Sequence, residues 1–573
     1  MQILINHLGY QKSESKFALV QVSTQNPSQA GFLDLYSWNS TGGTLLAEFE
    51  YSAPQAIAEW KTGLASSVDF SSIQTVGRCF FKDRTTGICS ENFEIHEKFS
   101  TDFWISDILF YFKGQRCSGY FDQADRALPL FEYRPGFEKD VHGGWYDASG
   151  DMSKYFSHLS YANFFNPQQT PVVVWSLLKT FEKFSIADDI NSKKLKERLL
   201  EEALHGADFL VRMQDPEGFF YQTVFDQWSK DPKRRVLCSY KTQAGTLLPQ
   251  IQAAWRSGAG VAIAALAQAS RLCGDQRGDF AGARYLDVAK SAFEHLLANN
   301  RKYLPDGKEN LIDDYCSLLA GIELFKATKD QDYLTFCRGR AEAMTQMLGH
   351  DENSNAWWSA DRDCTRPFSH AAEEGMPVIA LIEYLSIETD LARHEPLLFI
   401  LRDQLNAQIQ LNSNIFNPFG LARQYTQNIN GGKKQAFFMA HQNETGYWWQ
   451  GENARLASLA FAWKKAAQLF SQDSDFAKQL NLASTRQIDW LLGLNPFDSC
   501  MWHGKGRNNI AYQEGYPNAP GGVCNGITSG FYNEEDIDFG PEDDETSQPH
   551  QRWRWREQWI PHGAWFLLAC SEL

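Results

Sequence analysis

The sequence predicts a two-domain protein in which a β-sandwich precedes an all-α domain. Three observations lead to this prediction. The chain has 573 residues, which is long for one domain, and 43% of them are hydrophobic, enough for a large core. Short β-type runs occupy residues 2–98, and apolar residues at helical spacing occupy the remainder.

The β-type runs are separated by turn residues at regular intervals. They cover residues 2–6, 16–22, 31–36, 44–49, 65–70, 77–82 and 92–96. Seven strands at this spacing are typical of an immunoglobulin-like sandwich, which we place at residues 1–98. No group of potentially catalytic residues lies in this part, so we expect it to have a structural role.

From residue 99 onward, apolar residues recur at i, i+3 and i+4. We expect helices at 103–112, 173–184, 195–210, 256–273, 280–298, 311–327, 332–348, 371–388, 395–411, 452–471, 476–493 and 558–571. Twelve helices joined by long irregular loops fit an (α/α)6 barrel of six helix hairpins, which we place at residues 99–573.

Composition excludes several classes of protein. A net charge of -16 and a pI near 5.3 disfavour binding to nucleic acid or to anionic membranes. No apolar run has the length of a membrane span, and the start of the chain lacks the pattern of a signal peptide. We therefore expect a cytoplasmic protein whose substrate is a small, imported molecule.

Cysteine and histidine positions give no sign of a metal site or of disulfides. The 11 cysteines include no CxxC pair, so we expect free thiols. No ligand spacing typical of zinc or calcium is present, and we predict neither a metal nor another cofactor. The oligomeric state is not indicated.

The stretch from His142 to Tyr155 carries the strongest catalytic signal. Asp147 and Asp151 lie four residues apart among glycines, which allow sharp turns and close approach to a ligand. Two such carboxylates can hold and activate a water molecule. The alternative is a surface turn, because Asp, Ser and Gly are ordinary turn residues.

A glycosidase that inverts configuration also needs an acid to protonate the leaving oxygen. Glu557 is the best candidate, since it begins an apolar helix and lies among tryptophans. Burial among aromatic rings raises the pKa of a carboxyl group, as an acid catalyst requires. The alternative is a glutamate that interacts with the helix dipole or pairs with Arg554 or Arg556.

Together these features resemble glycoside hydrolase family 9, whose members often carry an immunoglobulin-like module before an (α/α)6 barrel. The similar segments are Asn6–Tyr10, Gly143–Asp147 and Leu491–Phe497. The resemblance implies that Asp151 is the base, that Asp147 helps to hold the water and that Glu557 is the acid. It also implies inversion at the anomeric carbon.

Two departures from the family's cellulases bear on the substrate. Those enzymes space the aspartates as Asp-Ala-Gly-Asp, whereas Asp147 and Asp151 have three residues between them. The cellulases' Pro-His-His-Arg segment is replaced by Tyr516–Gly522. The chain thus looks more like the exo-β-glucosaminidase branch, which implies an inverting exo-acting β-glycosidase on β-1,4-linked amino-sugar oligosaccharides derived from chitin or chitosan. The alternatives are a cellodextrinase or endo-β-1,4-glucanase, and a catalytically silent sugar-binding protein.

Further residues are candidates for substrate binding. Carboxylates near the terminal sugar would favour a cationic amino sugar, and aromatic rings can stack on sugars. The candidates are Trp145, Tyr146, Asp313, Asp314, Trp357, Trp358, Asp361, Trp448, Trp449, Glu452 and Trp555. For Asp313 and Asp314 the alternative is an acidic pair at a helix N-terminus. For the tryptophans it is the core.

Overall fold

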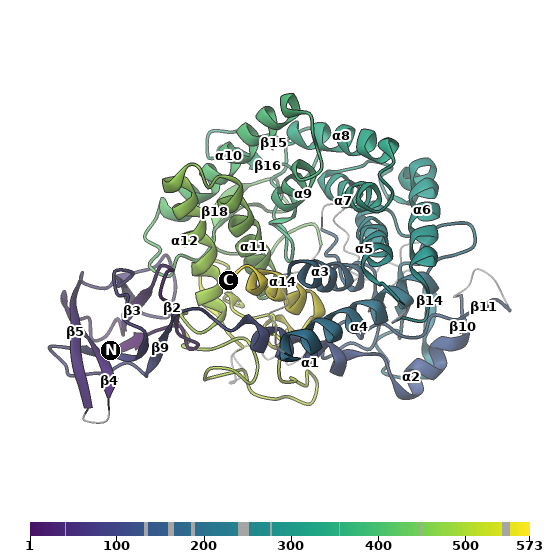
Figure 1. The fold of residues 1–573 in the computed structure, drawn as a ribbon. Coiled ribbons are helices and arrows are strands. Elements are labelled where there is room, and N and C mark those ends of the chain that lie inside the picture. Colours follow the sequence, from purple (N-terminus) through teal and green to yellow (C-terminus); the bar gives the residue numbers. More distant parts are fainter. Residues whose placement is uncertain are drawn as a thin grey trace.

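The computed structural model describes residues 1–39, 42–130, 136–158, 165–184, 190–238, 251–275, 278–354, 356–445, 449–540 and 551–573. Strands occupy the chain up to His96 and helices dominate from Thr101 onward. The first part forms a β-sandwich that lies to one side of a helical barrel (Figure 1).

The sandwich consists of two sheets that share one core. The first sheet has the order β1 (Gln2–Leu4), β3 (Phe17–Val22), β7 (Leu64–Asp69) and β6 (Gln55–Ala56). The second has the order β2 (Tyr10–Gln11), β9 (Phe93–His96), β8 (Gly77–Asp83), β4 (Gly31–Asn39) and β5 (Gly42–Tyr51). Each of the seven predicted runs contains an observed strand, and the two-residue strands β2 and β6 are additional.

Among the described helices, six inner ones form a closed ring in the barrel (Figure 1). In order around the ring they are α3 (Thr170–Lys183), α5 (Ala259–Leu272), α7 (Leu311–Thr328), α9 (Met376–Leu385), α11 (Asn453–Leu469) and α14 (Ile560–Ser571). Each packs against the next, and α14 packs against α3. In the described part of the chain, six further helices lie outside the ring, and each packs on at least one inner helix: α4 (Ile190–Arg212), α6 (Gly282–Asn299), α8 (Gln331–Thr345), α10 (Leu391–Ser413), α12 (Ser474–Leu491) and, on α14, α1 (Thr101–Gln115).

Short elements lie in the connecting segments of the barrel. The helices are α2 (Gly119–Ala124) and α13 (Trp553–Arg556), with 3-10 turns at Asp125–Ala127, Pro232–Arg234, Trp255–Ser257 and Asn300–Tyr303. The strands are β10 (Leu128–Pro129), β11 (Glu138–Lys139), β12 (Lys154–Tyr155), β13 (Thr223–Phe225), β14 (Val236–Cys238), β15 (Leu348–Gly349), β16 (Trp357–Trp358), β17 (Gln424–Gln427), β18 (Lys433–Ala436), β19 (Thr528–Ser529) and β20 (Ile537–Asp538).

Side-chain pattern explains why some helices are inner and others outer. In α5 every residue from Ala259 to Ala269 is buried, so small side chains fill a helix surrounded by protein. In α6 the buried residues form one stripe from Tyr285 to Leu296. A helix that is apolar on one face only can pack on the ring and leave its other face in water.

Hydrogen bonds and ion pairs join the starts of the inner helices at one end of the barrel. Gln168, before α3, donates from Nε2 to the carbonyl of Arg256, before α5, over 2.7 Å. Arg256 Nη1 lies 3.3 Å from Asp313 Oδ2 in the first turn of α7. Arg455 of α11 pairs over 2.8 Å with Glu374, which precedes α9. The loops at this end of the barrel are therefore brought together around one centre.

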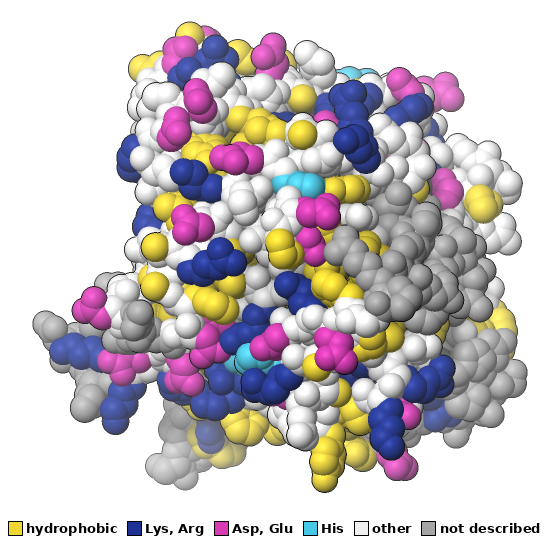
Figure 2. All heavy atoms as spheres, turned by 90° about the vertical axis from the view of Figure 1, so that its right-hand side faces the viewer, with side chains coloured by type: hydrophobic (Ala, Val, Ile, Leu, Met, Phe, Trp, Pro, Cys, Tyr) yellow, Lys and Arg dark blue, Asp and Glu magenta, His cyan; other side chains and the backbone are white. Residues whose placement is uncertain are grey.

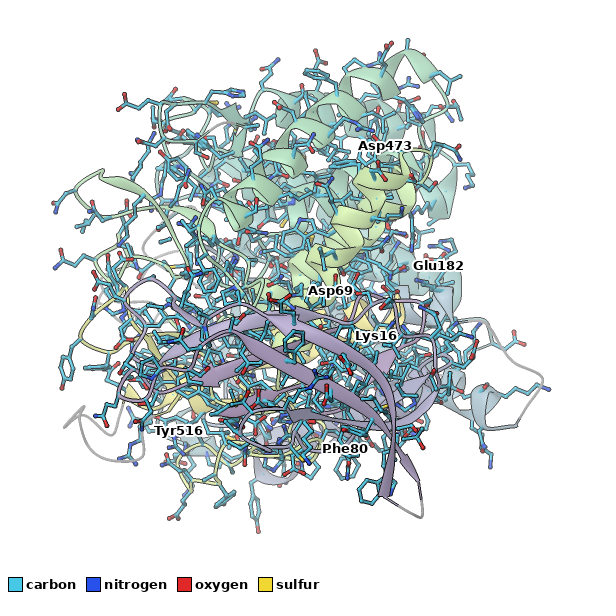
Figure 3. The ribbon with its side chains drawn as sticks, turned by 90° about the vertical axis from the view of Figure 1, so that its left-hand side faces the viewer. Lys16, Asp69, Phe80, Glu182, Asp473 and Tyr516 are labelled. Atoms are coloured by element: carbon cyan, nitrogen blue, oxygen red, sulfur yellow. The ribbon has the colours of Figure 1, made fainter. Side chains whose placement is uncertain are left out.

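The sandwich is attached to the barrel through two of the sequence motifs. His7 N donates to the carbonyl of Leu492 over 2.9 Å, and Asn6 Nδ2 donates to Asp489 Oδ1 over 2.7 Å. Gly493 has a φ of 108°, and a β-carbon there would lie 2.3 Å from His7 Nε2. Figure 3 views the molecule from this side, with the sandwich in front of the barrel.

One predicted helix begins later than expected. Residues 371–388 were predicted as helical, but α9 begins at Met376. His370 Nδ1 accepts hydrogen bonds from the backbone N–H groups of Ala372 and Glu373, which holds this segment in a turn. Pro377 then lies in the first turn of the helix, where its missing N–H costs nothing.

The surface and the cysteines agree with an ordinary globular chain. Acidic and basic side chains are interspersed on the face drawn in Figure 2. Among the described residues no helix is both long and apolar enough to cross a bilayer. The ten cysteines whose side chains the structure describes are all unpaired.

Candidate active site

Buried charges hold the loop that contains Asp147 and Asp151. Lys154 is fully buried, and its Nζ donates to the carbonyls of Val141 over 2.8 Å and Gly143 over 2.7 Å. It also pairs over 2.7 Å with the buried Asp125. Arg235 pairs with the same carboxylate and donates to the carbonyl of Met152 over 2.6 Å. These contacts hold the loop backbone before Asp147, at Val141 and Gly143, and after Asp151, at Met152.

The two aspartates have different surroundings. Asp147 is 3% exposed; its Oδ2 accepts from Trp559 Nε1 over 3.0 Å, and its Oδ1 is buried without a hydrogen-bond partner among the described residues. Asp151 is half-buried, and its two oxygens accept from Ser153 N and from the Tyr155 hydroxyl, each over 2.8 Å. Hydrogen bonds of this kind favour the ionised form of Asp151.

Glu557 lies directly against this loop. The loop backbone pairs with the segment after Glu557: Ser149 N donates to the carbonyl of Gln558, and Ile560 N to that of Asp147, each over 3.0 Å. A β-carbon at Gly150 would lie 3.1 Å from Glu557 Oε1 and 2.7 Å from Tyr516 Cδ1. A glycine at position 150 is required because the half-buried Glu557 and the Tyr516 ring occupy the space of a side chain.

The three carboxyl groups influence one another. Burial raises the pKa of Asp147 well above its ordinary value, and the charges of Asp151 and Glu557 add to this effect. Burial, and then the neighbouring Asp226, raises the pKa of Asp151. Burial, and then Asp151, raises the pKa of Glu557 to about 8, while Lys230 opposes the shift. A site of this kind can hold a protonated acid beside an ionised base at neutral pH.

Arg554 and Arg556, the predicted alternative partners of Glu557, are directed to other groups. Arg554 Nε donates to Gln551 Oε1 over 3.0 Å, and Arg556 Nη2 donates to the carbonyl of Gly540 over 2.9 Å. Within the described ranges, neither arginine forms an ion pair with Glu557.

Trp145 and Tyr146 lie away from the carboxyl groups. Trp145 is fully buried, and its Nε1 donates to Glu202 of α4 over 2.8 Å. The Tyr146 hydroxyl accepts from Ser118 N over 3.2 Å, and its ring packs edge-on against Phe121. The structure gives both residues a role in fixing the loop, and we do not include them among the sugar contacts.

The other predicted acidic residues have partners of their own. Asp313 forms a capping box with Asn310 and contacts Arg256, while Asp314 pairs with Arg340 and Arg362. Both lie in the first turn of α7, where the alternative of an acidic helix N-terminus puts them, and both are fully buried.

Asp361 and Glu452 are also engaged. Asp361 accepts from Ser359 and Thr365 within its own loop. Glu452 is 6% exposed and pairs with Arg455. Arginines therefore offset part of the negative charge of Asp313, Asp314 and Glu452, whereas the groups that bond Asp361 are uncharged.

The predicted tryptophans that the structure describes are buried. Trp357 and Trp358 are 6% and 4% exposed, and Trp555 is fully buried. Trp449 stacks on the His441 ring, with centroids 4.0 Å apart, and the Arg554 guanidinium lies over the Trp449 ring at 3.9 Å. Trp448 lies outside the described residues.

Several residues around the carboxyl groups were not predicted. Tyr155 bonds Asp151, Trp559 bonds Asp147, and Tyr516 covers Gly150. Tyr155 lies close to Asp151 in the sequence and Trp559 lies close to Glu557, and this proximity is the one sign in the sequence that they belong to the site. Asp226 is far from Asp151 and Glu557 in the sequence, so no such sign points to it. In the part of the chain that the structure describes, no three His, Cys, Asp or Glu side chains are placed to hold a metal ion.

A comparison with protein families gives one match, which covers most of the chain. The family model of glycosyl hydrolase family 9 matches residues 104–515. No curated protein matches the chain in sequence.

Solved structures of this family share the fold. A metagenome-derived family 9 endoglucanase is 17% identical over 100% of this chain and 98% of its own, with a TM-score of 0.65. A family 9 protein of Bacteroides ovatus is 17% identical over 100% and 98%, with a TM-score of 0.62. AaCel9A in complex with cellobiose-like isofagomine is 16% identical over 100% and 99%, with a TM-score of 0.61. At such identities the likeness shows the fold.

Proposed function

Because the chain belongs to glycosyl hydrolase family 9, we propose that it hydrolyses β-1,4-linked oligosaccharides with inversion at the anomeric carbon. Glu557 is the general acid, Asp151 is the general base, and Asp147 orients the attacking water. The domains are an immunoglobulin-like module at residues 1–98 and an (α/α)6 barrel at residues 99–573. One observation carries the proposal: the backbone pairing of the Asp147–Ser149 segment with Gln558 and Ile560 brings all three carboxyl groups to one site.

The protonation states of Glu557 and Asp151 determine how the glycosidic bond is cleaved. Glu557, with its pKa raised to about 8, keeps a proton at neutral pH and gives it to the leaving oxygen as the glycosidic bond breaks. Asp151, ionised with the help of Ser153 N and Tyr155, takes a proton from water as the water oxygen bonds the anomeric carbon.

An amino-sugar oligosaccharide cleaved from one end is the first candidate substrate. The carboxyl groups of Asp147, Asp151, Asp226 and Glu557 influence one another at the site, and the charge of Lys230 opposes their effect on Glu557. Such a site favours a cationic sugar over a neutral one. The loop also differs from that of the family's cellulases, because three residues rather than two lie between Asp147 and Asp151.

A β-1,4-glucan is the second candidate, with the chain acting as a cellodextrinase or endoglucanase. Family 9 endoglucanases share the fold over nearly their whole length, and solved relatives hold a cellobiose-like isofagomine or cellotriose. Neutralisation of Asp313, Asp314 and Glu452 by arginines removes part of the charge argument for an amino sugar.

Parallel hydrolysis of three disaccharides tests these candidates. The glucosamine dimer, the N-acetylglucosamine dimer and cellobiose are incubated with the enzyme, and released monosaccharide is measured. Preference for the glucosamine dimer supports the amino-sugar substrate, and preference for cellobiose overturns it. Binding of all three without release would identify a sugar-binding protein that lacks turnover and would overturn the proposed reaction.

A further inference from the structure

We infer that Trp228 stacks on the sugar chain that occupies the active site, from a loop at Asp226–Asp231 that forms one wall of the site. The inference rests on the proposed function, because it assigns the apolar binding surface for the same substrate. The indole of Trp228 is open to solvent, whereas the tryptophans at positions 357, 358, 449 and 555 are buried.

Strand pairing places Trp228 on the side of the sheet that faces Asp151. In the sheet β12–β13–β14, Tyr155 pairs with Thr223, and Lys154 pairs with Val224. Successive side chains of a strand point to opposite faces, so Thr223 and Phe225 share the face of Tyr155. The Tyr155 hydroxyl bonds Asp151. The face that carries Phe225 is therefore the face of the catalytic base.

Trp228 covers that face beyond the end of β13. Its ring packs edge-on against Phe225, with centroids 5.2 Å apart and planes at 87°. Phe225 is 5% exposed, whereas Trp228 is 51% exposed. One edge of the indole is thus anchored on the active-site face of the sheet while its surface remains open to solvent.

The loop is held rigidly by the buried carboxylate of Asp226. Asp226 Oδ1 accepts from Trp228 N over 2.8 Å, and Oδ2 accepts from Lys230 N over 3.0 Å. Asp226 Oδ1 also accepts from the hydroxyl of Ser153, two residues after the proposed base, over 3.0 Å. The same carboxylate therefore positions Trp228 and joins its loop to the catalytic loop.

The backbone of this loop adopts a conformation that non-glycine residues seldom take. Gln227, Trp228 and Lys230 have φ values of 57°, 51° and 53°. Such conformations persist when the surrounding contacts fix them, and they concentrate at ligand sites. The charge of Lys230 also opposes the rise in the pKa of Glu557, so the loop lies within electrostatic range of the proposed acid.

Steady-state kinetics of Trp228→Ala and Trp228→Phe test the inference. Trp38 in the sandwich is also 51% exposed, so Trp38→Ala is a matched control. Substrates are tetrasaccharides of glucosamine and of glucose, and circular dichroism checks that each variant is folded. We expect Trp228→Ala to raise KM about tenfold with kcat little changed, and Trp228→Phe to raise it less, because loss of aromatic contact weakens binding. Trp38→Ala should match the wild type.

The outcomes separate this inference from the proposed function. If the wild type cleaves a tetrasaccharide but KM is the same in Trp228→Ala and Trp38→Ala, the stacking role is overturned. A fall in kcat with unchanged KM overturns it as well. If the wild type cleaves neither tetrasaccharide, the proposed function fails, and calorimetric binding of the same tetrasaccharides decides. Weaker binding by Trp228→Ala supports stacking, and equal binding overturns it.

Discussion

Ser149 and Gln558 are 409 positions apart, yet two hydrogen bonds join them, one between their backbones and one to the Ser149 side chain. Ser149 N donates to the carbonyl of Gln558, and Gln558 N donates to Ser149 Oγ, each over 3.0 Å. Ser149 lies between the two aspartates, and Gln558 follows Glu557 directly. This contact therefore fixes the proposed acid relative to the proposed base.

Glu557→Gln should abolish most cleavage of natural oligosaccharides. Without a proton donor for the leaving oxygen, kcat should fall by about 10²–10⁴. A substrate with an activated aryl leaving group needs little protonation, so its cleavage should fall much less. Comparison of kcat for the two substrates measures the effect.

The control for this variant is Glu395→Gln, which changes an exposed glutamate of α10 on the outside of the barrel. The wild-type rate should fall as the pH rises through about 8, where Glu557 loses its proton, and this alkaline limb should be missing in Glu557→Gln. Equal loss on both substrates would count against Glu557 as the acid.

Asp151→Asn and Asp147→Asn, compared side by side, identify the base. Asp151 accepts two hydrogen bonds that favour its ionised form, while burial keeps the pKa of Asp147 well above its usual value. We expect Asp151→Asn to lose kcat by about 10²–10⁴ and Asp147→Asn to retain more activity. If only Asp147→Asn is inactive, the two roles are exchanged.

Tyr155→Phe should move the acidic limb of the pH–rate profile. The variant removes a hydrogen bond that favours ionised Asp151, so the pKa of Asp151 rises. A base works only when ionised, so the acidic limb moves to higher pH. Tyr146→Phe is the control, because the Tyr146 hydroxyl contacts Ser118 instead. Identical profiles for the two variants would contradict the assignment of Asp151 as base.

Asp313→Ala should destabilise the barrel. It removes a capping box and leaves the buried Arg256 without one of its partners, at a cost of about 3 kcal/mol in the free energy of unfolding. Asp332→Ala is the control, since Asp332 is exposed in the first turn of α8. Urea unfolding compares the two. Equal midpoints would show that Asp313 has no structural role and would return it to the substrate candidates.

Periodicity and turn residues predicted the fold well because each element obeys local rules. The apolar run of α5 and the single stripe of α6 are visible in the sequence and are sufficient to identify both helices. The late start of α9 was missed because it depends on His370, whose imidazole accepts two backbone N–H groups.

The site was predictable only in part. Asp147, Asp151 and Glu557 belong to segments whose composition is unusual, and the structure brings these segments together. The partners of Asp313 and Asp314 come from Arg256, Arg340 and Arg362, which no local pattern connects with them. Trp228 was overlooked because its surroundings depend on strand register and on the Asp226 carboxylate.

The configuration of the first sugar released tests the central claim most directly. A tetrasaccharide that the enzyme cleaves is followed by proton NMR in the first minutes, before the anomers interconvert. Water activated by Asp151 and a leaving group protonated by Glu557 require that the new reducing end appear first as the α-anomer. Initial formation of the β-anomer would show retention and would contradict the proposed roles of these residues.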